Sequence, residues 1–206
     1  MNRHPVRRAA AAIALPTLAT AASAVVDQVS PPANGGALQI NQPGFQWQQQ
    51  EEVVVGVAGQ LVGIDLFYVF AQPFNQPQDF HLALYGGAGW HADAGTALLG
   101  PTALTPFVGT MSLDPSAAGL RFNVGDTFVI ALTALGPNTD CCAIEANFGL
   151  YTSGQLFLWG TPYDYGGDLT FTTCMAPVLE PSRWALVALG LAGMAGLARR
   201  RSAGQS

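Results

Sequence analysis

The amino-acid sequence predicts an all-β fold, an antiparallel β-sandwich or jelly roll, between an N-terminal signal peptide and a single C-terminal transmembrane helix. Apolar and polar residues alternate through the middle of the chain, and Gly and Pro interrupt these runs. Both ends carry uncharged apolar stretches beside arginines. We expect a signal peptide over 1–24, an exported body over 25–176 and a tail over 177–206.

The first residues have the layout of a secretory signal peptide. A basic start is followed by residues 9–19, which are mostly alanine and leucine, and Ala22 and Ala24 form a small-x-small cleavage site. Cleavage is expected after Ala24. Arg7 and Arg8 form a twin arginine, but the usual flanking residues of a Tat signal are missing, which favours the Sec route.

The body has strand periodicity. Alternation with period two places one face of a strand on a core and the other in water. No stretch between Val25 and Ala176 shows a convincing helical repeat. Five segments alternate, and their expected core residues are Val62, Ile64, Leu66, Tyr68 and Phe70; Phe80, Leu82 and Leu84; Leu120, Phe122 and Val124; Phe128, Ile130 and Leu132; Leu169 and Phe171.

The body is strongly acidic. Between Val25 and Ala176 one arginine, Arg121, stands against twelve Asp and Glu residues, a formal charge of −11. Phosphate contacts need a basic surface, so this charge excludes nucleic acid as a partner and disfavours adsorption to an anionic membrane.

Three segments of the body carry a further resemblance: 55–65 reads as strand, tight turn and strand, 122–128 has a Gly-Asp turn before a core strand, and 167–173 reads as a closing strand. This order resembles bacterial exported β-sandwich modules that are similar in shape to carbohydrate-binding modules. The resemblance implies a sandwich fold and a glycan as ligand.

Three cysteines occur in the chain. Export to an oxidising compartment permits disulfides, and the odd count leaves one thiol over. We expect Cys174 to bridge to Cys141 or Cys142; a strained Cys141–Cys142 bridge is the alternative. No Cys-x-x-Cys spacing indicates a zinc site.

The sequence offers little catalytic chemistry. His81 and His91 each have an aspartate two residues away, which suits a metal site or an acid–base pair, although a strand residue and a loop residue explain them as well. Ser153 does not lie in a Gly-x-Ser-x-Gly elbow. We therefore expect no catalytic residue and no metal ligand.

Calcium stays open as a cofactor without assigned ligands. It takes oxygen ligands, and Asp93, Asp140, Asp164 and Asp168 fall in predicted loops. No Asp-x-Asp-x-Asp-Gly loop occurs, and the surface acidity of a soluble exported domain explains the same residues.

Aromatic residues give the clue to binding. Trp90, Trp159, Tyr163 and Tyr165 fall in or beside predicted loops, where flat rings can stack on sugars. Packing at strand ends is the alternative explanation for each of them.

The tail has the pattern of a membrane segment with a positive stop. Trp184 to Ala198 is uncharged and is followed by Arg199, Arg200 and Arg201. Fifteen helical residues span about 22 Å, which is short for a hydrocarbon core of roughly 30 Å. Snorkelling arginines and local thinning of the bilayer make up the difference, and the basic cluster stays in the cytoplasm.

Val178, Leu179, Glu180, Pro181 and Ser182, then Trp184, the Gly-rich apolar stretch and the three arginines resemble a PEP-CTERM sorting signal. Leu179 replaces the first proline of the usual Val-Pro-Glu-Pro motif. The resemblance implies processing by an exosortase, an integral membrane cysteine protease. It also implies a Gram-negative bacterium that makes exopolysaccharide and biofilm. The protein is then held in the inner membrane in transit and released to the cell surface or matrix.

Three functions follow as hypotheses. The first is a non-enzymatic surface or matrix protein associated with exopolysaccharide, with a glycan as its ligand. The second is a secreted hydrolase acting on extracellular polymer, and the third is a passive structural protein without a ligand. A binder should expose a row of aromatic rings, whereas a hydrolase should present two convergent carboxylates roughly 5–10 Å apart.

Overall fold

Two antiparallel sheets make up the part of the chain that the computed structural model describes, which is residues 23–32, 36–42, 45–46, 48–69, 80–92, 96–104, 109–134, 141–177 and 190. These residues are mostly strand, so the all-β antiparallel prediction is confirmed. The remaining residues include Ala22, Asp93, Asp140, the motif at 178–182, Trp184 and the arginines at 199–201, so those predictions lie outside the described residues.

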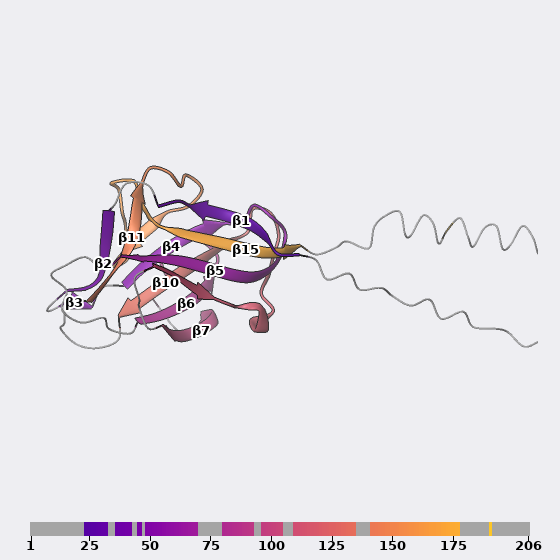
Figure 1. Ribbon diagram of the computed structural model, residues 1–206, viewed down its shortest axis with the longest axis horizontal. Helices are drawn as coiled ribbons and strands as arrows, with labels where there is room; N and C mark the ends of the chain where they lie inside the picture. Colours follow the sequence, from indigo (N-terminus) through magenta and orange to yellow (C-terminus); the bar gives the residue numbers. More distant parts are fainter. Residues whose placement is uncertain are drawn as a thin grey trace, which may run out of the picture.

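The larger sheet has nine described strands in the order β1-β15-β5-β11-β2-β3, with β8 and β9 on β5 and β14 on β11 (Figure 1). β5 pairs with four other strands and so forms its centre. The strands are β1 (Val25–Ser30), β2 (Gly36–Gln42), β3 (Phe45–Gln46), β5 (Gly59–Val69), β8 (Gly109–Leu113), β9 (Arg121–Phe122), β11 (Cys141–Phe148), β14 (Gly167–Leu169) and β15 (Phe171–Pro177).

The smaller sheet has six described strands in the order β13-β12-β4-β10-β6-β7. They are β4 (Gln48–Val54), β6 (Phe80–Gly86), β7 (Ala97–Leu104), β10 (Thr127–Ala134), β12 (Leu156–Leu158) and β13 (Thr161–Pro162). A short 3-10 turn, η2 (Ser116–Ala118), follows β8. Within the described residues, no helix has the length and apolar character that crossing a membrane requires.

The core lies between the two sheets. Alternate side chains of β6 and β10 are fully buried there, as the period-two pattern predicts: Phe80, Leu82 and Leu84 from β6, and Phe128, Ile130 and Leu132 from β10. Leu61, Ile64 and Leu66 of β5 meet them from the larger sheet. Burial of this apolar surface is the main force that holds the layers together.

Two predicted core residues are wrong. Val62 of β5 is only partly buried, because the register between β5 and β15 shifts at this residue and Leu61 takes the core position. Val124 is 66% exposed, because β9 ends at Phe122 and residues 123–126 form a turn. The Asn123 N–H donates to Asp126 Oδ2 at 2.6 Å, and Gly125 has a φ of 86°. The Gly-Asp turn was predicted, but its apolar neighbour lies at the tip instead of in the core.

A loop covers the outer face of the smaller sheet. Gln50 binds the backbone of His91 twice, accepting from its N–H at 2.8 Å and donating to its carbonyl at 2.7 Å. Glu52 Oε2 accepts from Gly89 N–H at 2.8 Å. The loop lies beside a second small cluster of buried residues that includes Tyr85 and Val129. The period-two pattern of the sequence predicted that this face would be exposed to water.

The first strand is held at the sheet edge by Asp27. The register between β1 and β15 shifts at this residue, which forms a bulge. Its Oδ1 accepts from the N–H groups of Gly56 and Val57, at 2.8 and 2.5 Å, in the turn between β4 and β5. One carboxylate therefore ties the edge strand to a neighbouring turn.

Candidate functional site

The most exposed of the described aromatic side chains, Tyr165, lies beside β14 together with three other apolar side chains. We define the aromatic surface as Phe148, Leu150, Tyr163 and Tyr165; Tyr165 is 82% exposed. The rings of Tyr163 and Tyr165 lie 5.4 Å apart at 54°. Gly149 N–H donates to Gly166 O at 2.7 Å, which joins the two loops that carry these residues. The surface thus presents several apolar faces to solvent from two separate segments.

Gly167 makes this gathering possible. A Cβ at this position would lie 2.7 Å from Cε1 of Tyr163 and 3.2 Å from Cε1 of Phe148. Only a residue without a side chain lets both rings lie against the start of β14 at these distances. The adjacent Gly166 has a φ of 68°, which turns the chain from Tyr165 into the strand.

Trp159 and Trp90 meet at a different place, the hairpin between β12 and β13. Trp159 and Gly160 form its two-residue turn with φ values of 51° and 80°, the signs that a type I′ turn requires. Trp90 packs on this turn, since a Cβ on Gly160 would lie 3.5 Å from its Nε1. Trp159 is 47% exposed, whereas Trp90 is half-buried. A bulky residue at positive φ costs energy, which makes Trp159 a candidate for selection by function.

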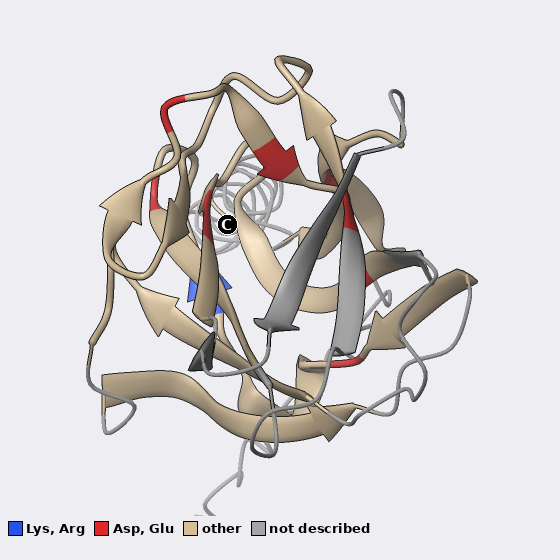
Figure 2. Cartoon of the chain, turned by 90° about the vertical axis from the view of Figure 1, so that its left-hand side faces the viewer, with Lys and Arg blue, Asp and Glu red and all other residues tan. Residues whose placement is uncertain are grey.

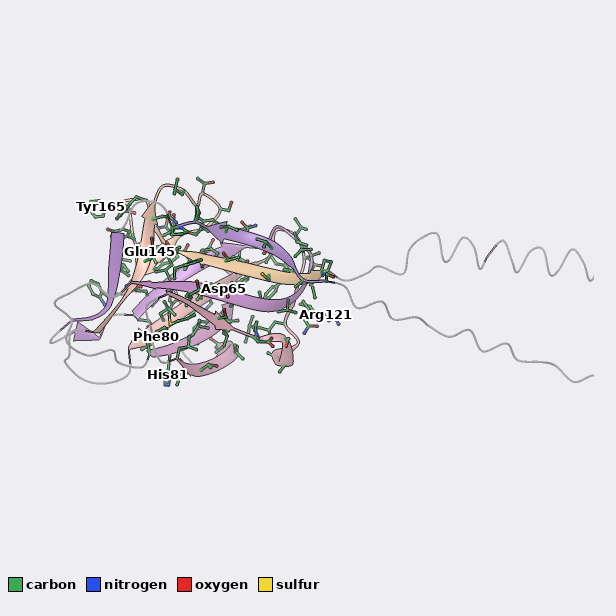
Figure 3. All side chains as sticks on the ribbon, viewed as in Figure 1. Asp65, Phe80, His81, Arg121, Glu145 and Tyr165 are labelled. Carbon is green, nitrogen blue, oxygen red and sulfur yellow. The ribbon has the colours of Figure 1, made fainter. Side chains whose placement is uncertain are left out.

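Acidic residues dominate the surroundings. Arg121 is the only Lys or Arg in the described ranges, and Figure 2 shows it against acidic residues spread over several strands and loops. Asp164 lies between the two tyrosines of the aromatic surface in the sequence. Arg121 lies toward the other end of the body from Tyr165 (Figure 3). Negative charge therefore prevails on the body, and it opposes the approach of a polyanion to the aromatic surface.

A hollow of about 440 Å³ opens elsewhere, lined by Gly86, Gly87, Phe122, Gly125, Asp126 and Thr127. It contains one carboxylate, and Asn123 already donates to this group from its backbone N–H at 2.6 Å and from its side chain at 3.2 Å. The hollow includes none of the sequence-predicted site residues.

Two carboxylates lie inside the body. Glu51 of β4 is fully buried and Asp168 of β14 is 5% exposed. Glu51 Oε2 accepts from Leu169 N–H at 3.0 Å, while its Oε1 has no hydrogen-bond partner among the described residues. Nearby, Tyr151 Oη accepts from Val54 N–H at 3.2 Å.

These two carboxyl groups resist ionisation. Burial raises the pKa of Asp168 to about 6. Burial also raises the pKa of Glu51 well above its ordinary value, and the negative charge of Asp168 adds to that effect. The same burial raises the pKa of the Tyr151 hydroxyl. Shifted carboxyls are typical of active sites, but these two lie in the interior and do not line the hollow.

The two histidines are not brought together as a site. His91 stacks on Tyr85 with ring centroids 4.9 Å apart and planes at 8°. His81 lies four residues before Tyr85 on β6, opposite Thr133 and Ala103. Within the described residues, no group of three or more His, Cys, Asp or Glu side chains is placed to hold a metal ion.

The predicted bridge from Cys174 to Cys141 or Cys142 is not formed, because Cys174 is a free cysteine. It pairs with Gly63 of β5, whereas β11 meets β5 at Val69, where Ala143 is the partner. Six residues of strand separate these points by roughly 20 Å, and a disulfide needs Cα atoms within about 7 Å. Burial raises the pKa of the Cys174 thiol.

Among the sequence-predicted residues, the structure brings Tyr163 beside Tyr165 and Trp90 beside the Trp159 turn. Phe148 and Leu150 were missed, because an apolar residue at the end of a strand is typical of a core position. The sequence feature that could have indicated their exposure is the glycine between them, because Gly149 has a φ of 76° and turns the chain at the end of β11. Comparison with protein-family models and with curated proteins finds no match to this chain.

Proposed function

We propose that this chain is an exported, non-enzymatic surface or matrix protein that a PEP-CTERM-like tail delivers. One observation carries this proposal: the strands begin and end where the sequence divides the chain. β1 begins at Val25, directly after the expected cleavage site, and Ala24 is exposed. β15 ends at Pro177, next to the sorting motif that begins at Val178. The described strands therefore begin and end within one residue of the expected limits of the body, 25–176, which supports the proposal.

We further propose that the two-sheet body is a β-sandwich that binds an uncharged polysaccharide of the extracellular matrix. The aromatic surface supports this, because pyranose rings present apolar faces that stack on exposed aromatic rings. The charge of −11 over residues 25–176 opposes binding of acidic polymers. The hydrolase alternative has less support, since the coupled carboxylates Glu51 and Asp168 are buried.

The export proposal is tested by the intact mass of the protein from its own cells, separated into membrane and medium. A product that starts at Val25 and ends near Glu180–Pro181 supports both processing steps, and added mass indicates covalent attachment. Retention of the whole C-terminus in the membrane refutes the sorting signal and leaves a plain anchor.

The ligand proposal is tested by sedimentation with insoluble neutral glucans and, in parallel, with the acidic polymer alginate. We expect binding to a neutral glucan, and loss of at least about fivefold in affinity for Tyr165→Ala, from the roughly 1 kcal/mol that an exposed aromatic contact provides. Val124→Ala is the control, because Val124 is an apolar residue in another loop that is 66% exposed against 82% for Tyr165. Absence of binding to every neutral glucan favours the passive structural role.

A further inference from the structure

The start of the first described strand and the end of the last one lie side by side. Val25 of β1 pairs with Met175 of β15, so the start of the first strand lies beside the end of the last. Pro177, where β15 ends, pairs with Gly59 at the start of β5. Figure 1 shows the start of β1 and the end of β15 side by side at one end of the two sheets. We call this end of the body the terminal pole.

Two further segments lie at the terminal pole. Gln60 pairs with both Ala176 and Arg121, which places the lone described cation one strand away from the chain exit (Figure 3). The turn at 123–126 is joined to the start of the β4–β5 connection, where Gly125 N–H donates to Val55 O at 2.8 Å. Val124 projects from that turn.

Exposed valines project from the terminal pole, and its carboxylates accept hydrogen bonds from backbone N–H groups. Val26 and Val124 are 57% and 66% exposed. Asp27 and Asp126 accept backbone N–H groups of turns, and Asp114 accepts from Ser116 N–H at 2.9 Å. Two exposed valines and one arginine can lie against lipid headgroups once the tail holds this end of the body at the bilayer.

We propose that the terminal pole faces the bilayer while the tail is inserted, and that the body holds its aromatic surface away from the membrane. This rests on the proposed export and tail anchoring. From Pro177 to the interfacial Trp184 the chain advances seven residues, at most about 25 Å, so the pole cannot move far from the lipid. The signal peptide ends at the same pole, so both membrane segments of the precursor reach one bilayer.

The terminal pole and the aromatic surface lie far apart along the body. The seven residues of β15 carry the chain roughly 23 Å from Phe171 to the pole. Tyr165 precedes β15 and lies toward the opposite end in Figure 3. A ligand at the aromatic surface would therefore bind on the solvent side of the anchored protein.

The test uses the chain from Val25 to Ser206 in vesicles of phosphatidylethanolamine and phosphatidylglycerol with an energy acceptor on the headgroups. A donor dye is placed by Val124→Cys or Tyr165→Cys in a background with serine at the three native cysteine positions. We expect several-fold more transfer from position 124 than from 165. Insertion of fifteen Gly and Ser residues after Pro177 should abolish the difference. Equal or reversed transfer overturns the orientation.

A second measurement needs no substitution. Hydrogen exchange of the unmodified chain should show slower exchange at residues 123–126 in vesicles than in detergent, with no change at 163–166. The reverse pattern overturns the proposal. Failure of the chain to float with vesicles overturns the tail anchor as well, and so separates failure of the proposed function from failure of the orientation alone.

Discussion

Asp168 should make the protein less stable as the pH rises. Its pKa in the folded state is raised from 3.8 to about 6, so the folded state holds a proton that the unfolded state releases. Well below pH 3.8 both states are protonated and stability does not depend on this group. Between about pH 4 and 6 the unfolded state releases a proton that the folded state keeps, so stability falls; above about pH 6 both states are ionised and the loss levels off. Each pKa unit corresponds to about 1.4 kcal/mol, which gives roughly 3 kcal/mol as the upper limit by pH 8.

Asp168→Asn should remove this cost. We expect the variant to match the original protein at pH 4 and to exceed it by about 1–3 kcal/mol at pH 8, allowing for relaxation around the charge. Urea unfolding of residues 25–177 at pH 4, 6 and 8 measures the difference. Glu51→Gln should act in the same direction, since an amide oxygen can still accept from Leu169 N–H.

Asp164→Asn is the matched control, because it removes one negative charge from an exposed site four residues away. It should leave the pH dependence unchanged. A rise in the unfolding free energy of the original protein between pH 4 and 8 refutes the reasoning. A gain in unfolding free energy from Asp168→Asn that is smaller at pH 8 than at pH 4 also refutes it.

Three further predictions concern stability. Asp27→Ala should cost about 2 kcal/mol, since two backbone N–H groups lose a charged acceptor, while Asp27→Asn costs less; equal losses in urea unfolding would contradict this. Gly154→Ala should lower the melting temperature, because its Cβ would lie 1.9 Å from Glu52 O, whereas Gly100→Ala meets open space and should not; similar effects would rule out the steric argument. Cys174→Ser should change the unfolding free energy by less than about 1 kcal/mol, and a loss near 3 kcal/mol would indicate a bridge after all.

Local patterns predicted the strands whose two faces differ. Phe80, Leu82 and Leu84 alternate with less apolar residues, and these three side chains do face the core. Turn chemistry likewise predicted the bend at Gly125 and Asp126. In both cases neighbours in the sequence decide the structure, so a single sequence is sufficient.

Long-range burial could not be predicted. β4 reads Gln-Gln-Gln-Glu-Glu-Val-Val, a polar segment by composition, yet Gln49, Gln50 and Glu51 are all fully buried. Their burial depends on β14 and on the loop through His91, which arrive from elsewhere in the chain. The aromatic surface is similar, because Phe148 meets Tyr163 only through the pairing of β11 with β14.

The pairing of the first strand with the last sets an order of events during synthesis. β1 finds its only described strand partner in β15, and Val25 lies 150 positions from Met175. The first strand to emerge must therefore wait until nearly the whole body has been made, and its edge stays open until then. Final closure of the larger sheet at this edge therefore comes only when β15 has arrived.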